Sequence, residues 1–158
     1  MIFVTVGTQL PFDRLIRTMD GWANATGSNV FAQIGPASSY KPCHIRTRAD
    51  LSPEAFDEAM DEARIIVAHA GMGTILSGLE RGKPVIIMPR RAIYGEHRND
   101  HQLATAAKLA HLNGLHVAAD ESALLRLLSD HTLLKNGPAL ASGASQGLIT
   151  AIREFISP

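Results

Sequence analysis

Short apolar runs alternate with segments of helical periodicity along most of this chain. Runs that are apolar at most positions and rich in β-branched side chains predict buried strands. The predicted strands are residues 2–6, 29–34, 44–47, 65–68, 85–88 and 115–117. After the first of them, apolar residues recur three or four positions apart at Phe12, Leu15, Ile16 and Met19, which predicts a helix with one buried face.

Capping signals place the boundaries of the other helices. Ser52 and Pro53 are typical of an N-cap and a first helical position, and Gly82 and Gly114 are typical of the residue just after a helix. One helix is predicted to begin at residue 53, and the remaining ones cover residues 74–81, 96–112, 122–128 and 146–156. The polar or small-residue stretches 37–42 and 135–145 are predicted to be loops.

This alternation predicts an α/β fold, a Rossmann-like doubly wound parallel sheet with helices on both faces. With 158 residues, the chain is expected to form a single domain over residues 1–158. In such sheets ligands bind at the carboxyl ends of the strands. Glycine-containing turns follow the predicted strands at Gly7, Gly35 and residues 69–74, so these turns are expected to share one edge.

Composition narrows the possible partners. The formal net charge is zero, which argues against a broad electrostatic surface for nucleic acid or an anionic membrane. A single cysteine, Cys43, excludes an internal disulfide and a multi-cysteine zinc site, and it fits a reducing compartment. No apolar stretch is long enough to span a bilayer, and the N-terminus has a strand pattern without a basic leader. We therefore expect a cytoplasmic protein.

The turn after the strand at 65–68 is the first candidate site. Gly71 and Gly73 would let backbone N–H groups approach a ligand, and Thr74 begins the predicted helix, whose N-terminus favours an anion such as phosphate. The structural alternative is that any strand-to-helix turn needs a glycine. A dinucleotide site is a weaker alternative, because the third glycine of that motif is missing and the turn follows the fourth strand instead of the first.

The segment after the strand at 85–88 is the second candidate site. Residues 89–102 hold three arginines, two histidines, two carboxylates and two amides. These side chains suit a sugar, whose hydroxyls need many hydrogen-bond partners. Two alternatives stay open: a solvated loop that leads into a helix, and a metal site at His97 and His101, which are four residues apart but have no third ligand placed by the sequence.

Several motifs together resemble a known family. They are VTVGTQ (4–9), PFDRLI (11–16), HAGMGT (69–74), GKP (82–84) and EHRNDHQ (96–102). They look like the C-terminal, donor-binding half of family 28-type glycosyltransferases. The resemblance is closest to stand-alone versions of that half, such as the soluble subunit of the two-part dolichol-linked UDP-GlcNAc transferase and bacterial counterparts in exopolysaccharide and capsule synthesis. It covers roughly residues 1–130.

The resemblance implies one half of a GT-B glycosyltransferase that binds a UDP-sugar as donor substrate and needs no other cofactor and no metal. By position, it assigns Gly71, Gly73 and Thr74 to the donor diphosphate. The residues that it assigns to the donor sugar are Asn99, His101 and Gln102. Those that it places along the same cleft are Gly7, Thr8, Gln9 and His69.

One position departs from the family pattern. Related enzymes often have an acid three residues after the Thr74 position, where it binds the ribose hydroxyls, and this chain has Ser77 there. A serine can give one hydrogen bond but not the two-point contact of a carboxylate. Glu80 lies one turn further along and is more typical of a solvated helix acid. Ser77 is therefore the ribose candidate on this helix.

The function implied is an inverting, UDP-sugar-dependent glycosyltransferase subunit that acts on a lipid-diphosphate-linked acceptor in exopolysaccharide or capsule synthesis. A membrane-anchored, acceptor-binding partner is expected to recruit it to the inner face of the cytoplasmic membrane. Among donors, glucuronate is a candidate, since Arg90, Arg91 or Arg98 could pair with its carboxylate. No catalytic base is identified, and we expect the partner to supply it. The competing interpretation is a non-enzymatic nucleotide-sugar-binding or regulatory module of the same fold.

Overall fold

The structure, a computed structural model, describes residues 1–134, 136 and 137. Its centre is a parallel sheet of six strands in the order β3-β2-β1-β4-β5-β6, which confirms the predicted doubly wound fold. The strands are β1 (Ile2–Thr5), β2 (Val30–Gln33), β3 (Arg46–Arg48), β4 (Ile65–His69), β5 (Val85–Met88) and β6 (Leu115–Val117).

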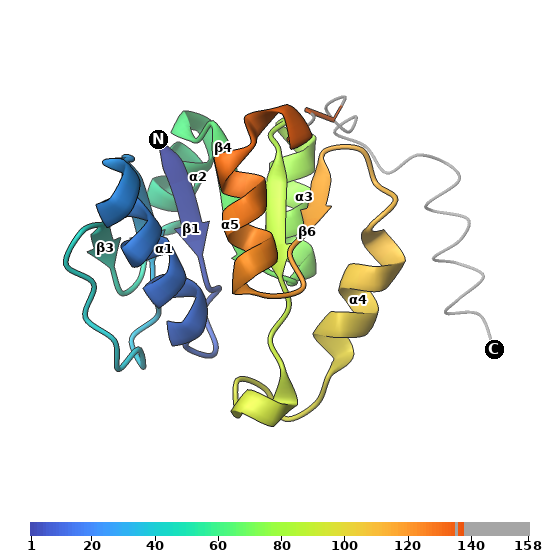
Figure 1. Ribbon diagram of the computed structural model, residues 1–158. Coiled ribbons are helices and arrows are strands. Elements are labelled where there is room, and N and C mark those ends of the chain that lie inside the picture. Colours follow the sequence, from blue (N-terminus) through green and yellow to red (C-terminus); the bar gives the residue numbers. More distant parts are fainter. Residues whose placement is uncertain (135, 138–158) are drawn as a thin grey trace.

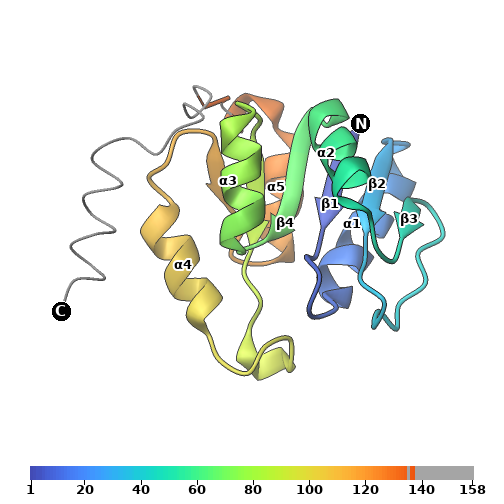
Figure 2. The same ribbon diagram turned by 180° about the vertical axis from the view of Figure 1, so that it is seen from behind.

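Helices cover both faces of this sheet (Figures 1 and 2). Their bounds are α1 (Asp13–Thr26), α2 (Pro53–Glu62), α3 (Met72–Glu80), α4 (His101–Leu109) and α5 (Glu121–Ser129), with short 3-10 turns η1 (Ala92–Tyr94) and η2 (His131–Leu133). Helices α1 and α5 lie on the face seen in Figure 1, α2 and α3 cover the opposite face, and α4 lies beside the β6 edge. Among the described residues, no helix combines the length and apolar character that crossing a bilayer requires.

Because both faces are covered, the central strands are apolar at nearly every position. Along β1, Val4 packs into the core beneath α1 and α5, while Phe3 packs into the core beneath α2 and α3. Successive side chains of a strand point to opposite faces, so each central strand contributes to both cores. The continuous apolar runs read from the sequence therefore correspond to buried strands.

The predicted helix over 96–112 is wrong at its start. Residues 92–94 form η1, and α4 begins only at His101. Two carboxylates account for the difference: Glu96 accepts a hydrogen bond from the Arg91 amide (2.9 Å), and Asp100 accepts one from the Ala92 amide (2.8 Å). These bonds fold the segment back on itself, since side-chain acceptors compete with helical hydrogen bonds.

Smaller differences concern other boundaries. Strand β3 begins two residues later than predicted, and α3 begins at Met72 instead of Thr74. The predicted C-terminal helix over 146–156 lies outside the described residues. The carboxyl ends of β1 and β4 lie next to each other at the point where the strand order reverses. In this fold that switch point is where a crevice for ligands forms.

Candidate functional site

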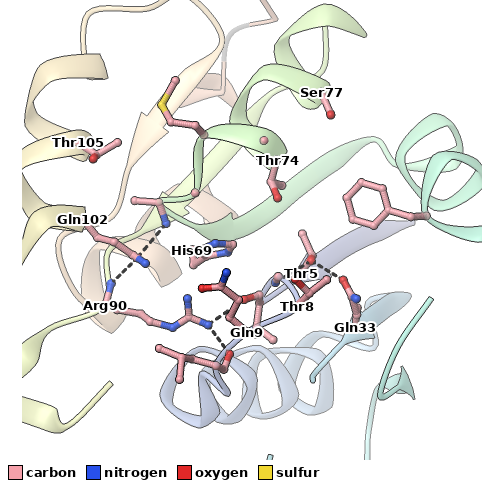
Figure 3. Close-up of a pocket in the computed structure, with 18 of the residues that line it drawn as sticks. Thr5, Thr8, Gln9, Gln33, His69, Thr74, Ser77, Arg90, Gln102 and Thr105 are labelled. Carbon is pink, nitrogen blue, oxygen red and sulfur yellow. Dashed lines mark hydrogen bonds between the residues drawn. The ribbon is translucent and has the colours of Figure 1, made fainter. Parts of the chain in front are cut away.

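A cavity of about 710 Å³ opens at this switch point. It is bordered by the turns after β1 and β4, by the beginnings of α2 and α4, and by the first two turns of α3 (Figure 3). The predicted cleft residues Gly7, Thr8, Gln9 and His69 all belong to its lining. This volume lies in the range typical of small-molecule sites.

The N-terminus of α3 forms one wall of the cavity. Gly71 is the N-cap residue and has no side chain to cap the helix, and the first helical hydrogen bond runs from the Ile75 amide to the Gly71 carbonyl (3.1 Å). The amides of residues 72–74 precede that bond, so they are available to a ligand. Thr74 lines the cavity beside them. This arrangement suits an anionic group such as a phosphate.

His69 fills the space between two glycine turns. A Cβ atom built on Gly7 would lie 2.7 Å from His69 Cε1, and one built on Gly71 would overlap His69 Nε2. Gly7 also has a positive φ of 74°. In contrast, a Cβ atom on Gly73 would meet nothing within 4 Å. All three glycines line the cavity, but Gly7 and Gly71 also make room for the imidazole, whereas a side chain on Gly73 would meet no neighbour.

The imidazole of His69 is neutral at physiological pH. Burial, together with the nearby positive charge of Arg90, lowers the pKa of His69 from 6.5 to about 4. Its buried Nδ1 makes no hydrogen bond of good geometry among the described residues, although an interaction with the Thr5 backbone slightly opposes the fall in pKa. A neutral ring can offer one N–H or one lone pair to a ligand, but it brings no positive charge to the cavity.

Arg90 holds the turn after β1 in place. Its buried guanidinium donates through Nη2 to the carbonyls of Val6 (2.8 Å) and Leu10 (2.5 Å), and it lies over the Phe12 ring at 5.1 Å from the centroid. Burial lowers the pKa of Arg90 to about 10, so the side chain stays charged at neutral pH. Only Nη2 is engaged by the protein backbone; the buried Nε has no hydrogen-bond partner among the described residues, and Arg90 lines the cavity, so its pairing with a sugar carboxylate stays a prediction.

Gln102 joins the ends of β4 and β5. Its side chain is only 4% exposed, and its Oε1 accepts hydrogen bonds from the amides of Ala70 (3.3 Å) and Arg90 (3.0 Å), as Figure 3 shows. Gln102 lies in the cavity lining, as does His101. Asn99 is outside the lining, and its Oδ1 lies 2.5 Å from His101 Nδ1. Two of the three predicted sugar residues thus reach the cavity, and the third lies behind one of them.

Several charged side chains of segment 89–102 bind other residues of the protein and so fix the position of the segment. Glu96 forms a two-point ion pair with Arg14 (2.6 and 2.8 Å), which also contacts Glu121 at 3.1 Å. The rings of His97 and His101 meet edge to face with centroids 4.4 Å apart. No group of three or more His, Cys, Asp or Glu suited to a metal occurs in the part of the chain that the structure describes.

Some cavity residues come from elements that no sequence motif pointed to. Thr5 donates to Gln33 (2.7 Å) at the ends of β1 and β2, and both line the cavity. Asp57 of α2 lines it as well, near Ser77 of α3, whereas Glu80 does not. The alternation of apolar residues marks where strands end, but it carries no signal for which side chains on a neighbouring helix reach the same cavity.

Comparisons with known proteins fit this geometry. A profile of the glycosyltransferase family 28 C-terminal domain matches residues 1–151. The UDP-N-acetylglucosamine transferase subunit ALG13 of Mus musculus is 30% identical over 95 residues, which are 54% of this chain and 8% of the mouse protein. The chain therefore spans only a small part of that relative.

Solved structures show the same fold at low sequence identity. The NMR structure of ALG13 has a TM-score of 0.63 and 19% identity, with 98% of this chain and 94% of that chain covered. MurG of Acinetobacter baumannii has a TM-score of 0.58 and 21% identity, with 84% of this chain and 42% of MurG covered. Os79 of O. sativa in complex with UDP has a TM-score of 0.61 and 15% identity, with 83% of this chain and 31% of Os79 covered. This chain belongs to the glycosyltransferase family 28 C-terminal domain family.

Proposed function

We propose that this chain is the donor-binding half of a GT-B glycosyltransferase and takes a UDP-sugar. The observation that carries the proposal is the α3 N-terminus, where the amides of residues 72–74 and the open face of Gly73 border the cavity. A diphosphate at that position would be stabilised by these amides, by the Thr74 hydroxyl and by the helix dipole. The likeness to the UDP complex of Os79 supports this proposal through the shared fold.

The proposed reaction is a single displacement with inversion. An acceptor hydroxyl oxygen attacks the anomeric carbon as the bond from that carbon to the diphosphate oxygen breaks, and UDP leaves with the electron pair. Negative charge grows on the diphosphate, and groups held at the α3 N-terminus stabilise it. The proton of the attacking hydroxyl must pass to a base. Burial and the nearby charge of Arg90 lower the pKa of His69, which makes it a weak base, and we propose that the partner supplies the base instead.

The donor sugar is proposed to lie toward α4. His101 and the amide nitrogen of Gln102 are its candidate contacts, and Asn99 would act by orienting His101. For a glucuronate donor, Arg90, Arg91 and Arg98 are the candidates for the carboxylate. Arg90 lines the cavity, and its Nη2 also donates to the carbonyls of Val6 and Leu10. The acceptor is proposed to be a polyprenyl-diphosphate-linked sugar in exopolysaccharide or capsule synthesis.

A partner subunit would complete the cleft. This chain covers 42% of MurG and 31% of Os79, but 94% of the ALG13 structure, and its mouse relative is itself named as a subunit. We propose a membrane-anchored partner that recruits the chain to the cytoplasmic face. Its docking surface includes the rim at residues 9–12 and the exposed side chains of Ile93 (83%) and Tyr94 (57%). The predicted helix over 146–156 carries the apolar residues Leu148, Ile149, Ile152, Phe155 and Ile156, which suit either a second docking surface or packing on the chain's own sheet; residues 146–158 lie outside the described residues.

A ligand screen tests the donor. UDP, UDP-GlcNAc, UDP-glucuronate, UDP-galactose and NAD are titrated against the purified chain by calorimetry, and one UDP-sugar is expected to bind more tightly than UDP alone. Binding of NAD without UDP would contradict the proposal. Transfer is then measured with and without membranes from the source cells. Tight donor binding with no transfer under either condition would favour the non-enzymatic module.

A further inference from the structure

We infer that Asp57 of α2 provides the carboxylate that binds the ribose hydroxyls of the donor nucleotide. This inference rests on the proposed function, and it concerns the end of the cavity opposite the sugar. Asp57 and Ser77 both line the cavity, one from each of two neighbouring helices. Helix α3 itself offers only the Ser77 hydroxyl there, which can serve one ribose oxygen but not a pair.

The shape of the cavity places the nucleoside toward α2. Ser77 lies further along α3 than Thr74, on the side away from Gln102 and Thr105 (Figure 3). A UDP-sugar with its diphosphate at the α3 N-terminus and its sugar near α4 therefore extends its nucleoside toward Ser77. The lining at that end includes Leu51, Pro53 and Phe56 from the start of α2, and an aromatic ring among apolar groups suits the flat face of a base.

Arg81 fixes the position of the Asp57 carboxylate. Its Nη2 donates to Asp57 Oδ1 (2.7 Å), its Nη1 donates to the Ser77 carbonyl (3.0 Å), and its Nε donates to Asp61 Oδ1 (2.7 Å). One guanidinium thus holds Asp57 next to the turn of α3 that carries Ser77. The Asp57 side chain is still 63% exposed, and Arg81 engages only Oδ1, so Oδ2 is available to a ligand.

The chemistry of this end suits a ribose. The two ribose hydroxyls are donors, and a carboxylate oxygen together with a serine oxygen can accept both. The positive charge of Arg81 offsets the repulsion between Asp57 and the diphosphate. Asp61 provides a matched control, because it lies one helical turn after Asp57, binds the same arginine at the same distance and is absent from the cavity lining.

The test compares UDP with 2′-deoxy-UDP by calorimetry. The wild-type chain is expected to bind UDP about tenfold more tightly than the deoxy nucleotide. Asp57→Ala is expected to weaken UDP about tenfold and to bring the ratio of the two affinities close to one, whereas Asp61→Ala keeps the wild-type ratio. Adding Ser77→Glu to Asp57→Ala restores a carboxylate from α3 and is expected to recover the preference for UDP.

Three results would overturn the inference, and only one of them would also overturn the proposed function. If Asp57→Ala folds with an unchanged melting temperature and still prefers UDP as the wild type does, the ribose contact lies elsewhere and the proposed function stands. If the wild-type chain binds neither nucleotide, the proposed function fails and this inference fails with it. Equal loss of preference in Asp57→Ala and Asp61→Ala would assign the effect to the ion pairs of Arg81 and not to a ribose contact.

Discussion

The two glycines of the turn after β4 have different surroundings. A Cβ atom on Gly71 would meet the His69 ring, as would one on Gly7 in the turn after β1, while a Cβ atom on Gly73 would meet nothing. In the sequence Gly71 and Gly73 looked equivalent, because spacing alone does not tell whether the missing Cβ makes room for a ligand or for a side chain of the same protein. The structure separates a packing role from a candidate binding role.

Substitution of these glycines should therefore have different consequences. Gly73→Val is expected to leave the fold intact but to block access to the amides of residues 72–74, so that UDP affinity falls below detection in calorimetry. Gly71→Ala is expected to cost about 1–3 kcal/mol of unfolding free energy, because the added methyl group overlaps His69. Gly21→Val, on an open part of α1, is the control for both effects. Wild-type UDP affinity in a folded Gly73→Val variant would exclude this site.

His69 should make stability depend on pH between 7 and 5. The pKa of His69 is about 4 in the folded chain and 6.5 in the unfolded chain. As the pH falls, the unfolded chain therefore binds the proton first, and this protonation stabilises the unfolded chain relative to the folded one. Stability from this group is complete above pH 6.5 and is lost as the pH falls toward 4, by about 2 kcal/mol between pH 7 and pH 5. Urea unfolding at the two pH values measures it.

His69→Gln is the control for this pH dependence. The glutamine does not titrate, so the variant is expected to lose about 2 kcal/mol less than the wild type over the same interval. Asp13 and Asp20 have pKa values lowered below 3.8, because hydrogen bonds to their carboxylates more than offset the effect of burial. Asp13 and Asp20 therefore contribute little to the change in stability with pH above pH 5. An identical slope in the wild type and the variant would contradict the shifted pKa of His69.

At the scale of elements, the strands could be predicted and the segment from 89 to 100 could not. A strand buried on both faces is apolar along its whole length, which the sequence displays directly. The segment after β5 is instead shaped by single side-chain contacts over long sequence separations, such as Glu96 with Arg14. Polar residues there had several possible partners, and the sequence could not show that Arg90 would donate to the carbonyls of Val6 and Leu10.

Gln102 connects elements as well as lining the cavity. Gln102→Ala is expected to lower the unfolding free energy by about 1–3 kcal/mol, because the buried amides of Ala70 and Arg90 lose their acceptor. UDP affinity should fall moderately, since Ala70 immediately precedes the α3 N-terminus. UDP-sugar affinity should fall about tenfold further if the Gln102 amide contacts the sugar. Calorimetry with both ligands measures the difference.

Thr105→Ala is the matched control for this variant. Thr105 also lines the cavity from α4, but its hydroxyl donates to the carbonyl of His101 within its own helix (3.1 Å). Its removal is expected to leave both stability and the ratio of the two affinities close to those of the wild type. Equal weakening of UDP and UDP-sugar by Gln102→Ala would limit Gln102 to its role between β4 and β5.

At the scale of the whole molecule, the described elements border the cavity from one side only. The turns after β1 and β4 and the helices α2, α3 and α4 line it, but no described element faces them to hold an acceptor or exclude water. Transfer requires an acceptor hydroxyl held in line with the anomeric carbon. The isolated chain is therefore expected to bind UDP and to transfer no sugar until a partner completes the cleft.

The exposed side chain of Ile93 provides a test of that partnership. Ile93→Ser is expected to keep UDP affinity unchanged, because Ile93 is not part of the cavity lining. It is expected to lower both recruitment to source-cell membranes and membrane-dependent transfer at least tenfold, because its 83% exposed apolar side chain is proposed to contact the partner. Leu133→Ser, at a 48% exposed apolar position on η2, is the control and should retain both. Flotation assays and transfer assays supply the measurements. Sugar transfer by the purified chain alone at the rate seen with membranes would rule out the two-subunit enzyme.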